Sequence, residues 1–239
     1  GGRYIGTGSY NVTRDPDSGW INVGTYRVMI HSKDEVGFYI SPGKHGRIHR
    51  DKYEALGEPM PTVIVAGGDP LTFLMGTSDI PQETCEYDIV GGFRGKAMQL
   101  IEGKHTGLPF PADAEIVIEG FVHPTKKREE GPFGEFTGYM AGGREGPVFR
   151  VTCITHRKDP IVMGVISQFP PSESSMIKRA LLEAGLKKHL TEDLNLPGIH
   201  DVHALEAGGG TATLWISMKK MYSGHVDQTA FGTMGHFGM

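Results

Sequence analysis

Short apolar runs and apolar–polar alternation dominate roughly the first 155 residues of this 239-residue chain, and they predict strands rather than long helices. Residues 10–14 and 20–31 are rich in β-branched and aromatic side chains, and the sequence Asp-Pro-Asp-Ser-Gly between them is typical of a turn. The remaining strands expected here cover 36–40, 62–66, 97–101, 115–122 and 148–155. Short helices are expected at 47–56, which Gly57 ends, and at 70–75 and 83–90.

The pattern changes near residue 160. A strand is expected at 161–167, followed by the one long amphipathic helix, 174–190, which carries Ile177, Leu181 and Leu186 on one stripe. Strands at 199–205 and 211–218 and a helix at 223–231 follow. The sequence therefore predicts an α+β protein, with a strand-rich domain over residues 1–158 and a smaller α/β domain over 159–239.

Composition narrows the possible functions. The formal net charge of −4 provides no basic surface typical of nucleic-acid binding. No apolar run approaches the roughly 20 residues that cross a membrane. Cys85 and Cys153 are too few for a disulfide framework, which favours a reducing cytoplasm. The chain begins with Gly1-Gly2-Arg3 and ends with Gly238-Met239, so we expect it to be part of a longer polypeptide.

A loop with two carboxylates is the first candidate for chemistry. Glu130 and Glu135 flank a Gly-Pro-Phe-Gly sequence, in which the glycines permit a sharp turn and the proline fixes one backbone angle. Two acids held toward one point favour opposite protonation states, which suits proton transfer. A solvated surface turn is the other interpretation of the loop taken alone.

An amide and a guanidinium lie five positions apart on one expected strand. Strict alternation would place Asn22 and Arg27 on opposite faces, whereas a bulge near Gly24 would bring them to the same side. A solvated Arg27 on the outer face is the alternative.

Three more polar residues suggest a metal site. His45 is expected at the start of a helix, where free backbone amides favour an anion. Asn22, His45 and Glu86 together offer ligands that suit Mn²⁺ or Mg²⁺. His45 and His49, at i and i+4, could instead face zinc from one helix.

Several sequence blocks, in this order and at these distances, resemble the UbiD family of decarboxylases. The blocks are Trp20-Ile21-Asn22-Val23-Gly24-Thr25-Tyr26-Arg27, His45, Glu86, Pro111 to Gly120, and Glu130-Gly131-Pro132-Phe133-Gly134-Glu135. The resemblance runs from about residue 4 to residue 231 and implies a flavin-binding domain similar to a split β-barrel, followed by the start of an oligomerisation domain.

The resemblance also implies cofactors and residue roles. Enzymes of this family bind prenylated FMN and reversibly decarboxylate aromatic, heteroaromatic or α,β-unsaturated acids. Asn22, His45 and Glu86 match the ligands of a divalent ion, Mn²⁺ or Mg²⁺, which with K⁺ holds the cofactor phosphate. Arg27, Glu130 and Glu135 match the catalytic residues. The cofactor contacts expected from the resemblance are Asn22, Gly24, Thr25, Tyr26, Arg27, Lys44, His45 and Glu86.

From these roles we expect a cytoplasmic carboxy-lyase that assembles as a homo-oligomer and obtains its cofactor from a flavin prenyltransferase. Its partner is a small carboxylic acid, with no nucleic acid and no membrane. Glu135 is the expected proton donor, and Arg27 and Glu130 organise the site. A metal-dependent hydrolase using His45, His49 and Glu86 and a catalytically silent assembly subunit remain the alternatives.

Overall fold

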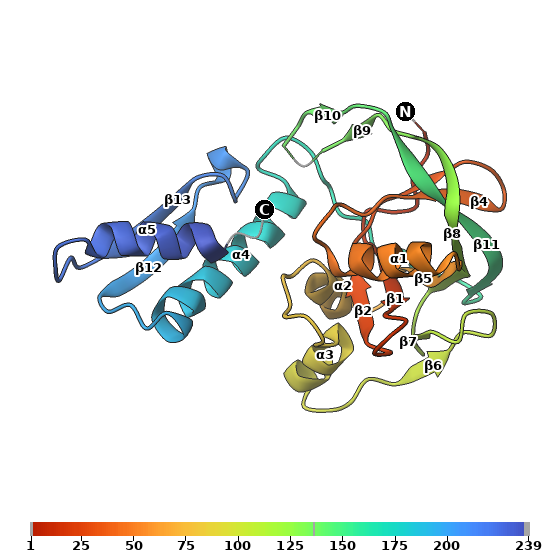
Figure 1. Cartoon of the computed structure of the whole chain (residues 1–239), viewed down its shortest axis with the longest axis horizontal. Helices are drawn as coiled ribbons and strands as arrows, with labels where there is room; N and C mark the ends of the chain where they lie inside the picture. The colour runs from red at the N-terminus through yellow and green to blue at the C-terminus, as the bar shows by residue number, and fades with distance from the viewer. Residues whose placement is uncertain (1, 136, 237–239) are drawn as a thin grey trace. The chain divides into compact units, whose positions relative to one another are not determined.

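The computed structural model describes residues 2–135 and 137–236, which form two compact units (Figure 1). The first unit comprises Gly1–Phe133 and Met140–Val165, and the second comprises Gly134–Tyr139 and Ile166–Met239. Helices and strands both contribute, which confirms the predicted α+β class. The predicted domain boundary at residues 158 and 159 stays a prediction. Within the described ranges, no helix is both long enough and apolar enough to cross a membrane.

A seven-stranded antiparallel sheet forms the centre of the first unit, in the order β2-β1-β5-β8-β11-β4-β3. Its strands are β1 Ser9–Arg14, β2 Ile21–Gly24, β3 Val28–Ile30, β4 Glu35–Phe38, β5 Met60–Ala66, β8 Ile116–Glu130 and β11 Arg144–His156. Strands β8 and β11 form a long hairpin that opposes Glu130 to Arg144 at one end and Ile116 to His156 at the other.

The sheet curls into a half-barrel because its two edge strands are neighbours in the sequence. Only residues 25–27 join β2 to β3, and this link spans roughly 14 Å at full extension. The Asn11 side-chain amide donates to the carbonyl oxygens of Gly24 (3.2 Å) and Tyr26 (3.0 Å) and so anchors the link. The single expected strand over 20–31 is therefore wrong, since β2 ends at Gly24 and the chain crosses to the other edge.

Buried apolar side chains hold the two parts of the curled sheet together. Phe38 of β4 packs on Phe149 of β11, with ring centroids 6.0 Å apart. The same core cluster includes Val28, Val36, Ile40, Met60, Ile64, Ile118 and Val122. Burying each such side chain contributes about 1.5–3 kcal/mol, so this core fixes the β3–β4 edge against the central strands.

Three helices complete the first unit, together with short strand pairs. Helix α1, His45–Leu56, packs against β1, β2, β5 and β8 and ends at Gly57, which has the left-handed φ of 72° that glycine favours (Figure 1). The other elements of this unit are α2 Pro70–Gly76, α3 Glu86–Arg94, and the pair β6 Leu100–Glu102 with β7 Pro109–Pro111. A further pair joins β9 Phe133–Gly134, of which only Phe133 belongs to this unit, to β10 Met140–Ala141.

The second unit has its own core. Helix α4, Glu173–Lys188, begins with a capping box at Ser172 and continues as a π-helical turn, His189–Asp193. The antiparallel pair β12 Ile199–Ala204 and β13 Leu214–Met218 follows, with a 3₁₀ turn, Glu206–Gly208, between the strands, and then α5 His225–His236. Its core side chains are Leu186, Leu190, Leu196 and Val202.

The expected strand over 161–167 is wrong. Ile161 donates its backbone N–H to Oε2 of Glu115 (3.1 Å), and Val165 donates its N–H to Oγ1 of Thr7 (2.7 Å). Side-chain oxygens thus take the place of a neighbouring strand as partners of this apolar segment.

A buried carboxylate fixes the loop between β6 and β7. Glu119, which is 2% exposed, accepts hydrogen bonds from the backbone N–H groups of Lys104 (3.2 Å), His105 (3.0 Å) and Thr106 (3.0 Å). The Thr106 hydroxyl adds a fourth, at 2.9 Å. Burial opposes ionisation, but the hydrogen bonds outweigh it and lower the pKa of Glu119 below its ordinary value.

We expect Glu119→Gln to lower the free energy of unfolding by about 1–3 kcal/mol at pH 7, because the amide cannot accept all four bonds. The pKa of Glu119 is lower in the folded state than in the unfolded state. The stabilisation by ionised Glu119 is therefore present above the unfolded pKa of about 4.3 and is lost as pH falls through the folded pKa. Urea titrations at pH 7 and below pH 4 check this. The exposed Glu102→Gln is the control and should change little; an equal loss in both variants would contradict the role of Glu119.

Candidate functional site

An ion pair between Arg27 and Glu130 lies at the point where the sheet edges approach. Arg27 directly precedes β3, and Glu130 is the last residue of β8. The Arg27 Nη2 atom is 2.8 Å from Glu130 Oε2, and the two side chains are 14% and 1% exposed. The curl of the sheet thus brings together two predicted catalytic residues that lie 103 positions apart.

Aromatic rings surround this ion pair. The guanidinium carbon of Arg27 lies 4.7 Å from the ring centre of Phe133 and 5.3 Å from that of Tyr39. The Tyr4 hydroxyl donates to Oε1 of Glu130 at 2.7 Å. Rings at these distances attract the cation and restrict its orientation. Tyr4, Tyr39 and Phe133 carry no sequence signal for a role at this site, since only the folded sheet brings them to Arg27.

A histidine also lies beside Glu130. A Cβ added at Gly37 would lie 2.8 Å from Nε2 of His31 and 3.6 Å from Cγ of Glu130, so glycine at this position allows both side chains to approach β4. Burial, aided by the charge of Arg128, lowers the pKa of His31 below its ordinary value. His31 is therefore a neutral imidazole near pH 7, and Arg27 carries the positive charge facing Glu130.

Glu135 belongs to the second unit and lies in a tight turn. Its backbone N–H donates to the carbonyl of Tyr139 (2.8 Å), and its own carbonyl accepts from the N–H of Gly138 (2.9 Å). The two bonds fix the backbone on which the carboxylate is carried. The convergence of Glu130 and Glu135 on one point stays a prediction.

Hydrogen bonds connect the backbone and side chains at and next to the three predicted metal ligands. The Tyr26 hydroxyl accepts from Nδ2 of Asn22 (3.2 Å) and from the N–H of Gly46 (3.1 Å), which follows His45. The N–H of Val23, next to Asn22, donates to Oε2 of Glu86 at 2.7 Å. Residues that lie 64 positions apart in the sequence thus come from β2 and from the first residues of α1 and α3.

The chemistry of this group fits a hard divalent cation. Glu86 is 2% exposed, and burial raises its pKa to about 7, so a nearby cation would stabilise the ionised form. Burial, followed by the charge of Lys44, lowers the pKa of His45 and favours the neutral, ligating imidazole. In the part of the chain that the structure describes, no set of three or more His, Cys, Asp or Glu side chains is arranged for a metal. The metal role of Asn22, His45 and Glu86 stays a prediction.

The other predicted cofactor contacts lie along the link between β2 and β3. A Cβ at Gly24 would collide with the Tyr26 hydroxyl, and a Cβ at Gly46 would lie 2.6 Å from Cε2 of that ring. Thr25 donates its N–H to the carbonyl of Gly76 at 3.1 Å. Lys44, the residue before α1, pairs its exposed amine with Asp79 at 2.9 Å.

The alternative zinc pair gains no support from the geometry. His49 is fully buried, and its Nδ1 is 2.9 Å from Oγ1 of Thr13. Burial lowers the pKa of His49 to about 4. His45 and His49 both meet the ring of Trp20 edge-on, at centroid distances of 4.8 and 4.9 Å. His49 is thus a packed core residue.

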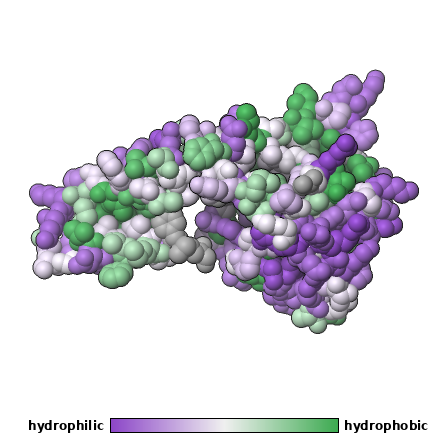
Figure 2. All heavy atoms as spheres, turned by 90° about the horizontal axis from the view of Figure 1, so that it is seen from above, coloured by the Kyte–Doolittle hydropathy of each residue, from purple (hydrophilic) through white to green (hydrophobic). Residues whose placement is uncertain are grey.

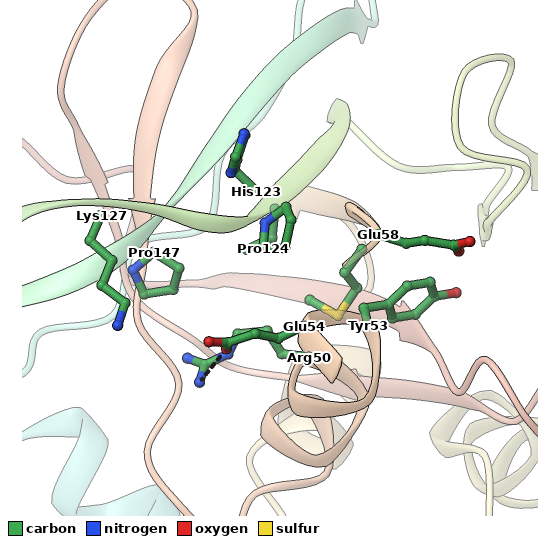
Figure 3. A pocket seen from close by; sticks show the side chains of 10 residues that line it. Arg50, Tyr53, Glu54, Glu58, His123, Pro124, Lys127 and Pro147 are labelled. Atoms are coloured by element: carbon green, nitrogen blue, oxygen red, sulfur yellow. Dashed lines mark ion pairs between the residues drawn. The ribbon is translucent and has the colours of Figure 1, made fainter. Parts of the chain in front are cut away.

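A pocket on the first unit involves none of the predicted site residues (Figure 3). Side chains of α1, β5, β8 and β11 line it, and Arg50 pairs there with Glu54 at 3.7 Å. Its charged groups have both signs, so its lining does not select one class of ligand.

Comparison with known proteins identifies the family. The model of the UbiD family, described as the 3-octaprenyl-4-hydroxybenzoate carboxy-lyase Rift-related domain, matches residues 1–170. The chain belongs to the UbiD family. The corresponding UbiD C-terminal domain matches residues 175–239. An "Uncharacterized protein" of Aquifex aeolicus (strain VF5) is 35% identical over 236 residues, which are 98% of this chain and 48% of that protein.

Solved structures of UbiD-class enzymes share the fold. HmfF from Pelotomaculum thermopropionicum, an evolved dimeric form in complex with prFMN, matches with a TM-score of 0.90 and 28% identity over 99% of this chain and 54% of its own. Vanillic acid decarboxylase from Sedimentibacter hydroxybenzoicus, in closed form, matches with a TM-score of 0.86 and 31% identity over 97% and 49% of the two chains. This UbiD family chain therefore spans about half the length of the relatives that it matches.

Proposed function

We propose that this chain carries the flavin site of a carboxy-lyase, which uses prenylated FMN to decarboxylate an aromatic, heteroaromatic or α,β-unsaturated acid reversibly and without net oxidation. The observation that carries this proposal is the Arg27–Glu130 pair, enclosed by aromatic rings, in a UbiD family chain. Keeping the carboxylate of the buried Glu130 side chain in an ion pair at 2.8 Å with a partly buried guanidinium is costly, which is typical of a functional site.

The protein's own residues would bind the acid and supply a proton. Arg27 grips the substrate carboxylate, which its planar guanidinium suits, while Glu130 and the two rings fix its orientation. When bound, the prenylated flavin supplies the electron sink that no side chain offers. Glu135 then donates a proton to the carbon that lost CO₂.

Asn22, His45 and Glu86 would hold a divalent ion, Mn²⁺ or Mg²⁺, that with K⁺ neutralises the cofactor phosphate. The link over residues 24–27 and the first residues of α1 lie beside these ligands and would contact the flavin. A flavin prenyltransferase would supply the cofactor, and we place the reaction in the cytoplasm.

A panel of aryl, heteroaryl and acrylic acids tests this function. Protein loaded with prenylated FMN should release CO₂ from at least one of them, and protein loaded with plain FMN should not. If no CO₂ were released with either flavin, although the protein was fully occupied by it, the proposal would be overturned. Zinc-dependent hydrolysis by flavin-free protein would favour the hydrolase alternative.

We expect His45→Ala to lower the bound Mn²⁺ and flavin of the purified protein by at least 10-fold, because one of three protein ligands is lost. The melting temperature should change little, since His45 is the first residue of α1. Metal analysis, flavin absorbance and thermal unfolding measure the three quantities. The exposed His200→Ala is the matched control. A parallel loss of stability and cofactor would indicate a structural role.

We also propose that the protein is a homo-oligomer through its second unit. Figure 2 shows apolar surface on this unit, where the exposed large apolar side chains include Trp215, Met221, Tyr222, Val226, Phe231 and Met234. Sedimentation of the complete polypeptide tests this, and a monomer at all concentrations would contradict it.

A further inference from the structure

Tyr4 is held in place by the backbone on either side of it. The segment around it lies antiparallel to β3, with Tyr4 opposite Met29. Ile5 donates its N–H to the carbonyl of Val28 (2.9 Å), and Ile30 donates its N–H to the carbonyl of Arg3 (2.7 Å). Tyr4 is therefore in register with the strand that begins directly after Arg27.

The Tyr4 side chain reaches from this strand to the end of β8. Its ring meets Phe133 edge-on at 4.7 Å, and its hydroxyl donates to Oε1 of Glu130 at 2.7 Å. The other oxygen of Glu130 accepts from Arg27 at 2.8 Å. Each oxygen of a fully buried carboxylate thus has its own donor, one neutral and one cationic.

The Tyr4 hydroxyl remains a donor over the whole physiological pH range. Burial, and then the hydrogen bond to Glu130, raises the pKa of Tyr4 to about 12. Among the described residues, the ionisable groups near Glu130 include Arg27, the neutral His31, and Arg144, its ladder partner on β11. The Arg144 guanidinium lies 4.5 Å from the ring centre of Tyr39.

We propose that Tyr4 is a positioning residue for the reaction: its hydrogen bond orients Glu130, so that Arg27 faces the substrate carboxylate. This inference rests on the proposed decarboxylase function. Tyr4 acts through Glu130 and transfers no proton itself.

Tyr4→Phe keeps the ring and its contact with Phe133 but removes the donor. We expect kcat/KM to fall by about 10- to 100-fold, as for one lost hydrogen bond to a charged group. Part of this fall should be a rise in KM for the acid, because Arg27 binds the substrate carboxylate, while flavin content and melting temperature stay unchanged. A merely structural role would lower the melting temperature without raising KM.

Tyr10→Phe is the matched control. Tyr10 lies on β1 of the same sheet and is 1% exposed, and its hydroxyl has no hydrogen-bond partner among the described residues. This variant loses a buried tyrosine hydroxyl that no carboxylate uses, so its kcat and its KM for the acid should match those of the parent protein.

Two results would be decisive in different ways. If the parent protein releases CO₂ and Tyr4→Phe matches Tyr10→Phe in kcat and in KM, the role of Tyr4 is wrong and the proposed function stands. If flavin-loaded parent protein releases no CO₂ from any acid, the proposed function fails and the positioning role fails with it. In either case, the ¹³Cζ chemical shift of Tyr4 in cofactor-free protein should differ between the parent protein and Glu130→Gln. This chemical shift reports the Tyr4–Glu130 hydrogen bond and does not depend on turnover.

Discussion

Glu135→Gln should abolish most turnover while leaving the fold and cofactor binding intact. Glutamine keeps nearly the shape of glutamate and the backbone bonds of Glu135 to Tyr139 and Gly138, but it cannot donate a proton as an acid. Loss of a general acid costs roughly 10²–10⁴-fold in rate. We therefore expect kcat to fall by at least 100-fold, with flavin content and melting temperature unchanged.

Hydrogen exchange separates the role of Glu135 from that of Glu130. The product's vinyl or ring hydrogen should exchange with D₂O in the parent protein, because exchange needs the same proton transfer without net loss of CO₂. Glu130→Gln should also lower turnover, through the orientation of Arg27. If Glu135→Gln exchanged the product hydrogen as fast as the parent protein, Glu135 would not be the proton donor.

Arg27→Met should have the largest effect on both stability and activity. It leaves the carboxylate of Glu130, whose side chain is 1% exposed, without its cationic partner. Removing one partner of a buried ion pair costs about 3–5 kcal/mol. The free energy of unfolding from urea titration should fall by this amount at pH 7, and CO₂ release should fall below detection because the substrate carboxylate loses its ligand.

A second substitution distinguishes loss of the charge partner from loss of packing. In Arg27→Met with Glu130→Gln, no buried charge is left uncompensated, so part of the lost stability should return while activity stays absent. If the double variant were as unstable as the sum of the two single variants, the ion pair would make no coupled contribution to the fold.

Local sequence signals were sufficient for most helices and strands. The helix that begins at His45 and ends at Leu56 follows from Gly57, whose positive φ ends it. The crossing over residues 25–27 could not be predicted, because it depends on β2 and β3 occupying opposite edges of one sheet. The segment 161–167 has the composition of a strand, but it bonds to side chains of Thr7 and Glu115 instead.

The site residues proposed from the sequence stay predictions, whereas some residues that surround Arg27 and Glu130 were not predicted at all. Arg27, Glu130 and the three metal-ligand candidates were found from spacing and from the family resemblance. Tyr4 could not be found this way, since its hydroxyl meets a carboxylate 126 positions further along the chain. A tyrosine in a glycine-rich segment carries no local sign of such a partner.

The order of strands in the sheet also determines when the site can form during synthesis. Strand β4 pairs with β11, whose first residue is Arg144, so the β3–β4 edge leaves the ribosome long before its neighbour. Arg27 and Glu130 are separated by 103 positions, which at roughly 5–20 residues per second corresponds to about 5–20 s of translation. During that interval the nascent β4 has an unpaired edge, which is open to pairing with other chains. Chaperone binding to nascent chains of this protein should therefore be strongest before the β8–β11 hairpin has emerged.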